Sequence, residues 1–123
     1  MSDYRPPLDD IRLVLAEISD LAAICDLPGY EHVDPETVDG VLDELGRFVA
    51  EVVAPVNRIG DEEGCSVTDG VVSAPEAFGT AWDKFVESGW AAISQDPDYG
   101  GGGFPGSVQT VLTELLATAS RAW

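Results

Sequence analysis

Basic residues are scarce in this chain, which carries 6 Lys and Arg side chains against 23 Asp and Glu in 123 residues. The formal net charge of −17 repels the phosphate backbones of nucleic acids and the surfaces of anionic bilayers. We therefore expect neither nucleic acid nor membrane among its partners. A solvated acidic shell is the ordinary explanation of such a balance, and a specific basic partner is the alternative.

Cysteine and histidine are nearly absent. Cys25 and Cys65 are the only cysteines and have no Cys-x-x-Cys spacing, which excludes a disulfide scaffold. Cys25 falls on the apolar stripe of an expected helix and is predicted to be a buried free thiol. His32, the single histidine, lies in a loop without a cysteine or serine partner, so we interpret it as a surface residue. The acids at 61–63 lack metal-ligand spacing. No catalytic set and no metal site are predicted.

Long hydrophobic runs are lacking as well. The first ten residues hold three Asp, two Pro and one Arg, with no apolar run after a basic start, so they do not form a signal peptide. No stretch reaches the roughly 18 uncharged apolar residues that a membrane-spanning helix needs. A soluble, cytoplasmic protein is the expectation.

Apolar residues at helical spacing are abundant. They recur with a period of about 3.6 along three long stretches and one shorter one, which predicts an all-α helical bundle with essentially no sheet. Asp34-Pro35 is a typical helix start, and Pro55 should kink or end that helix near Val52. The stripes run from Leu8 to Cys25, Val38 to Val56, Phe78 to Val86 and Val108 to Ala119.

Two stretches contain turn-forming residues. Asp69-Gly70 lies between valines and suits a tight hairpin, although an irregular loop is the favoured interpretation. The stretch 96–105 (DPDYGGGGFP) has four consecutive glycines, bracketed by aromatic residues and prolines. Glycine permits backbone angles that other residues avoid, and proline restricts the entry and exit of the turn. A flexible linker is one interpretation, and a shaped turn that passes close to something is the other.

These motifs together resemble the N-terminal helical domain of the acyl-CoA dehydrogenase family, in the long bacterial branch that carries an extra N-terminal helix. The likeness covers nearly the whole chain and depends on the order and spacing of the motifs. It implies an extension helix and loop at 1–33 and the domain itself at 34–123. The motifs are 27–31 (LPGYE), 53–57 (VAPVN), 61–65 (DEEGC), 85–90 (FVESGW) and the Tyr-Gly-Gly-x-Gly at 99–103.

The resemblance implies a flavoprotein that oxidises an acyl-CoA thioester between its α and β carbons, with FAD as hydride acceptor, in fatty acid metabolism. In the family a middle β domain and a C-terminal helical domain carry the base and nearly all flavin contacts. No catalytic or FAD-binding residue therefore transfers to this chain, and the 123 residues alone are predicted to be inactive and to hold no FAD. The implied partners are acyl-CoA, the remaining dehydrogenase domains or a complementary subunit, and further copies in a homo-oligomer.

The resemblance also implies positions for two sites. Leu115 and Ala119 fall on the helix that passes the acyl-tail pocket, although some family members have an acid where this chain has Leu115, which leaves the tail preference open. A core role for both residues is the alternative. The turn, with Tyr99, Gly100, Gly101, Gly103 and Phe104, is expected at a ligand or domain interface. Two other functions remain open, a stand-alone acidic helical protein-interaction module and an acidic decoy for nucleic-acid binders.

Overall fold

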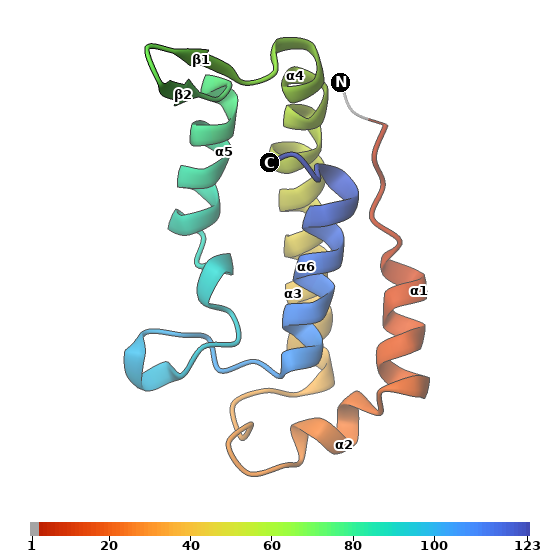
Figure 1. The fold of residues 1–123 in the computed structure, drawn as a ribbon. Coiled ribbons are helices and arrows are strands. Elements are labelled where there is room, and N and C mark those ends of the chain that lie inside the picture. Colours follow the sequence, from red (N-terminus) through yellow and green to blue (C-terminus); the bar gives the residue numbers. More distant parts are fainter. Residues whose placement is uncertain (1–2) are drawn as a thin grey trace.

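A computed structural model describes residues 3–123 and has the predicted all-α bundle, with only a two-stranded hairpin in addition (Figure 1). Within these residues, none of the helices is long and apolar enough to cross a membrane. The elements in chain order are α1 (Leu8–Leu13), a π-helical segment (Val14–Ile18), α2 (Leu21–Cys25), α3 (Pro35–Phe48), a second π-helical segment (Val49–Val53), α4 (Ala54–Glu63), β1 (Ser66–Thr68), β2 (Val71–Ser73), α5 (Glu76–Glu87), two 3-10 turns (Trp90–Ala92 and Pro97–Tyr99) and α6 (Gly106–Ala119).

A continuous helical column, made of α3, the segment Val49–Val53 and α4, forms the centre of the bundle (Figure 1). Its start follows the prediction, because the Asp34 carboxylate accepts a hydrogen bond from the Thr37 N–H at 2.7 Å. Pro55 does not end the column. The hydrogen bonding changes to the π pattern just before Pro55, and α4 then continues with the proline in its first turn.

The core lies where α1, α3, α5 and α6 meet. Its completely enclosed side chains come mainly from the column and from α6, and they are large aliphatic groups, so the apolar stripes read from the sequence are the buried faces. The most buried members are Val38, Leu42, Leu45, Val49, Val53, Val108, Leu112 and Leu115.

The N-terminal extension departs from the single helix expected from Leu8 to Cys25. The helix ends after Ile18, and Asp20 adopts left-handed backbone angles with φ of 49°. The Asp20 carboxylate then accepts a hydrogen bond from the Ala23 N–H at 3.3 Å and caps α2. Aspartate tolerates this conformation and caps helices well, which explains why the apolar stripe continues through a break in the backbone.

Arg12, in the extension, forms ion pairs with the column. The Arg12 guanidinium donates hydrogen bonds to the carboxylates of Asp39 and Asp43 on α3, the latter at 2.6 Å, and lies 3.4 Å from Asp9 on its own helix. These carboxylates raise the pKa of Arg12 further above its ordinary value. The pairs are largely exposed, so they set the position of α1 more than they stabilise the fold.

The hairpin β1–β2 contradicts the favoured interpretation of an irregular loop. Val67 pairs with Val72 and Thr68 with Val71 in an antiparallel ladder. The two connecting residues, Asp69 and Gly70, both have positive φ, at 50° and 78°. A two-residue hairpin connection needs this conformation, which Asp-Gly adopts readily.

Candidate functional site: the glycine turn and its surroundings

The stretch 96–105 folds back on the chain before it as a closed turn. Each amide from Gly100 to Phe104 donates a hydrogen bond to a carbonyl oxygen within residues 92–97. The pairs are Gly100 to Pro97 at 3.0 Å, Gly101 to Asp96 at 3.0 Å, Gly102 to Ala92 at 2.9 Å, Gly103 to Gln95 at 3.0 Å and Phe104 to Ile93 at 3.0 Å. These amides are all used within the turn, so none is left to bind a phosphate group.

The glycines of the turn are required for two different reasons. Gly100 and Gly103 have φ of 85° and 63°, in the left-handed region that favours glycine. A Cβ atom at Gly101 would lie 2.1 Å from the carbonyl oxygen of Gln95, and one at Gly102 would lie 2.6 Å from the carbonyl oxygen of Ile93. The backbone thus passes too close to itself for any side chain, and the stretch is a shaped turn rather than a flexible spacer.

The side chain of His32, in the extension, contacts both the backbone and a side chain of the turn. His32 Nε2 lies 3.1 Å from the Gly102 carbonyl oxygen, and the His32 ring packs edge-on against the Phe104 ring, with centroids 6.4 Å apart. The side chain is exposed, as predicted, but the sequence contains no signal for this contact, which joins residues 70 positions apart. Phe104 packs against the core, whereas Tyr99 at the tip of the turn is 90% exposed.

Leu115 and Ala119 lie on the face of α6 that packs into the bundle. Leu115 is completely buried and Ala119 is 6% exposed, both within the main apolar core. The Leu115 carbonyl oxygen also accepts a hydrogen bond from the Tyr4 hydroxyl at 3.4 Å. In this chain their side chains face the column rather than an open surface.

An aromatic groove of about 310 Å³ opens beside the C-terminal end of α6. Trp82 is 55% exposed, and its ring packs against those of Phe85 and Trp123 at centroid distances of 5.6 and 6.2 Å. The Trp123 indole N–H donates a hydrogen bond to the Phe78 carbonyl oxygen at 2.9 Å. Ser120 is 3% exposed, and its hydroxyl has no partner within residues 3–123. A half-open aromatic surface of this kind suits contact with another protein surface.

The described residues contain no group of three or more His, Cys, Asp or Glu side chains that could hold a metal ion.

The two cysteine thiols differ in their surroundings. Cys25 is buried and Cys65 is exposed, and neither forms a disulfide. Burial, together with the negative charges of Asp34 and Asp26, raises the pKa of the Cys25 thiol.

We expect the two thiols to react at very different rates in the native chain. The thiolate is the reactive form, so the raised pKa and the burial should make Cys25 react with an aromatic disulfide reagent at pH 8 about tenfold or more slowly than Cys65. Cys65→Ser and Cys25→Ser variants assign each phase, and a denaturant should make the two rates similar. Equal rates in the native chain would contradict the buried position of Cys25.

The sequence resemblance is confirmed by comparison with a known protein: the chain is related to the acyl-CoA dehydrogenase family. Over 120 residues, 98% of this chain, it is 33% identical to the 3-methylmercaptopropionyl-CoA dehydrogenase of Ruegeria pomeroyi (strain ATCC 700808 / DSM 15171 / DSS-3). The chain spans about a fifth of the length of that relative. No protein-family model matches the chain.

Proposed function

We propose that this chain is the N-terminal helical domain of an acyl-CoA dehydrogenase, with the extension at residues 1–33 and the domain at 34–123. The 33% identity to an acyl-CoA dehydrogenase across 98% of the chain supports the family, and the order of the sequence motifs between residues 27 and 103 is the ground for the N-terminal position. The helical bundle agrees with it. The complete enzyme would be a cytoplasmic homo-oligomer that removes hydrogens from the α and β carbons of an acyl-CoA thioester, with FAD as hydride acceptor.

FAD carries a pyrophosphate group, and the residues described here do not fit it. The amides of the glycine turn are occupied by internal hydrogen bonds, and the exposed tip beside them carries Asp96 and Asp98. Three of the six basic side chains in the sequence, Arg12, Arg47 and Arg58, are paired with carboxylates, and the other three, Arg5, Lys84 and Arg121, lie outside the turn in the sequence. The FAD site therefore belongs to the other domains of the enzyme, and the 123 residues alone should hold no FAD and oxidise no acyl-CoA.

The role left to this chain is that of a rigid wall. The turn at 96–105 and the aromatic groove with Trp82 and Trp123 both present shaped, partly apolar surfaces that would contact the remaining domains or a complementary subunit. Leu115 and Ala119, packed against the column, would hold α6 in place as the wall of the acyl-tail pocket. Close-packed protein interiors resist deformation, which a pocket wall requires.

A chimera tests the proposal directly. The segment of the Ruegeria enzyme that matches this chain is replaced by these 123 residues, and the product is purified and compared with the unchanged enzyme. The expected result is a chimera that retains stoichiometric flavin and reduces an electron-accepting dye when an acyl-CoA is added. The control is the same enzyme with the segment deleted, which should lose flavin or activity.

The contrary result is a chimera that melts cooperatively and keeps its flavin but oxidises none of a series of acyl-CoA thioesters. Such an outcome would favour the alternative, an acidic helical interaction module without a catalytic context. Flavin content and thermal melting distinguish that outcome from a simple failure of the chimera to fold.

A further inference from the structure

The backbone that carries His32 is fixed on both sides. On the C-terminal side, Val33 is 5% exposed and packs in the main core, and Asp34 caps α3. On the N-terminal side, the Glu31 carboxylate accepts a hydrogen bond from the Gly29 N–H, with each oxygen 3.1 Å from the nitrogen. His32 lies between these contacts, so its side chain reaches the glycine turn from a segment that has little freedom of its own.

The imidazole ring of His32 touches three consecutive residues of the turn. Its Nε2 atom lies 3.1 Å from the Gly102 carbonyl oxygen, and the ring meets the Phe104 ring edge-on. A Cβ atom at Gly103 would lie only 2.9 Å from the same Nε2 atom. The ring therefore lies against the turn backbone at Gly103, where the backbone has a positive φ of 63°.

The chemistry of the contact assigns the proton on the ring. A carbonyl oxygen only accepts hydrogen bonds, so Nε2 must donate. The neutral ring with its proton on Nε2 and the doubly protonated ring both supply this donor. The hydrogen bond is thus compatible with either charge state of His32, which suits a permanent contact rather than a pH-dependent one.

The turn needs such a contact because its backbone is rich in glycine. Four consecutive glycines have more conformational freedom than other residues, so a closed shape costs them more entropy. The hydrogen bonds within the turn hold the amides of residues 100–104 as donors. The bond from His32 acts on a carbonyl oxygen instead and comes from a segment 70 positions away, so it adds a constraint that the turn does not supply itself.

We propose that His32 is a positioning residue for the glycine turn and that the extension, through it, keeps the turn closed. The hydrogen bond from His32 Nε2 to the Gly102 carbonyl oxygen is the element that does so. Without this bond, residues 102–104 open more often while the bundle stays folded, because local opening costs less free energy than global unfolding. The surface that the turn presents to any partner is then set by the extension, whether or not the chain belongs to a dehydrogenase.

The test compares His32→Gln with His32→Leu. Glutamine has an N–H donor at a similar reach to Nε2, whereas leucine has none. Both variants lose the ring contact with Phe104, so the difference between them isolates the hydrogen bond, and both should fold because His32 is exposed. Amide hydrogen exchange is followed by NMR in the isotopically labelled chain. The amides of residues 102–104 should exchange about fivefold faster in His32→Leu than in His32→Gln, the factor expected from one net hydrogen bond.

Amides in the centre of the bundle are the internal control. Leu45 on α3 and Leu112 on α6 are almost completely buried, and their exchange reports opening of the whole bundle. Their rates should agree within about twofold between the two variants. Equal exchange of residues 102–104 in both variants would overturn the proposal, because the turn would then stay closed by its own hydrogen bonds. An equally large acceleration at Leu45 and Leu112 in His32→Leu would also overturn it, because the residue would then stabilise the bundle as a whole.

Discussion

Replacement of Gly101 by alanine is expected to lower the free energy of unfolding by at least about 2 kcal/mol, the usual cost of forcing an added methyl group into a packed site. The added Cβ would lie 2.1 Å from the Gln95 carbonyl oxygen and 2.2 Å from its carbon, and neither atom is the mobile end of a side chain. The backbone must shift, and the hydrogen bond from the Gly103 N–H to the same oxygen is weakened with it. Thermal or urea denaturation measures the change.

The matched control is Gly79→Ala, which makes the same chemical change inside α5. A Cβ atom there meets nothing within 4 Å, and the backbone is helical, so alanine should stabilise the chain by about 0.5–1 kcal/mol. The change in the free energy of unfolding caused by Gly100→Ala should lie between those of Gly101→Ala and Gly79→Ala, because the space around Gly100 is open but its φ is 85°. If Gly101→Ala stabilised the chain as Gly79→Ala does, the closed geometry of the turn would be wrong.

The same variants, placed in the chimera, test the proposed position of the turn. A turn that only joins two helices should affect stability and leave acyl-CoA turnover unchanged in the folded fraction. A turn at the ligand or domain interface should also change turnover or flavin retention, most clearly in Gly100→Ala, which disturbs the backbone least.

Helix positions and the buried faces were predictable from the sequence because both follow from short-range rules. The stripe from Val38 to Val56 is the buried face of the column, and the Asp34 cap follows from the preference of a carboxylate for free amides at a helix start. The interruption at Asp20 was not predictable from the stripe, since apolar spacing continues through it. A single residue in a left-handed conformation changes the backbone without changing the pattern.

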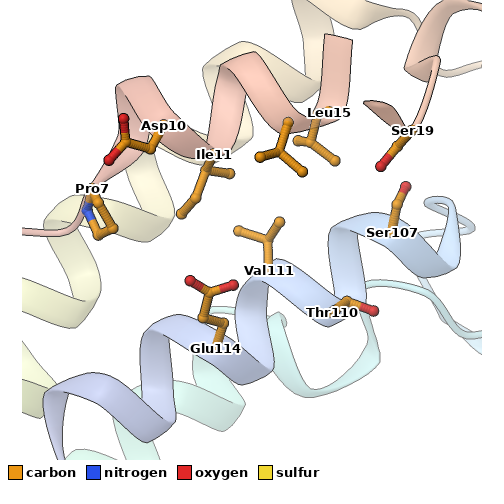
Figure 2. Close-up of a pocket in the computed structure, with 10 residues that line it drawn as sticks. Pro7, Asp10, Ile11, Leu15, Ser19, Ser107, Thr110, Val111 and Glu114 are labelled. Atoms are coloured by element: carbon orange, nitrogen blue, oxygen red, sulfur yellow. The ribbon is translucent and has the colours of Figure 1, made fainter. Parts of the chain in front are cut away.

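The surroundings of the site were predictable only in part. Consecutive glycines indicated a turn, but the contact of its backbone with Gln95 and the hydrogen bond with His32 join segments that no local pattern relates. The cleft between the extension and α6, which Asp10 and Glu114 help to line (Figure 2), depends in the same way on how two helices pack, since these residues lie 104 positions apart in the sequence.

Truncation of Leu115 to alanine should be among the most destabilising single changes in the chain. The side chain is completely buried between α6 and the column, so its removal leaves a cavity and loses the burial of three carbon atoms. Buried leucine-to-alanine changes typically cost about 2–5 kcal/mol. Leu13→Ala is the control: Leu13 is 61% exposed, and its truncation should change the free energy of unfolding by less than about 0.5 kcal/mol.

Placed in the chimera, the Leu115→Ala and Leu13→Ala variants also distinguish the two roles considered for Leu115, which are core packing behind the pocket wall and direct contact with the acyl tail. A residue that only supports the pocket wall should, when truncated, lower stability without a specific change in the acyl-chain length that the chimera prefers. A residue that touches the acyl tail should shift that preference toward longer chains at a smaller cost in stability, because the added space would open to the ligand. The complete burial of Leu115 against the column predicts the first result, and a shift in chain-length preference with an unchanged melting temperature would contradict it.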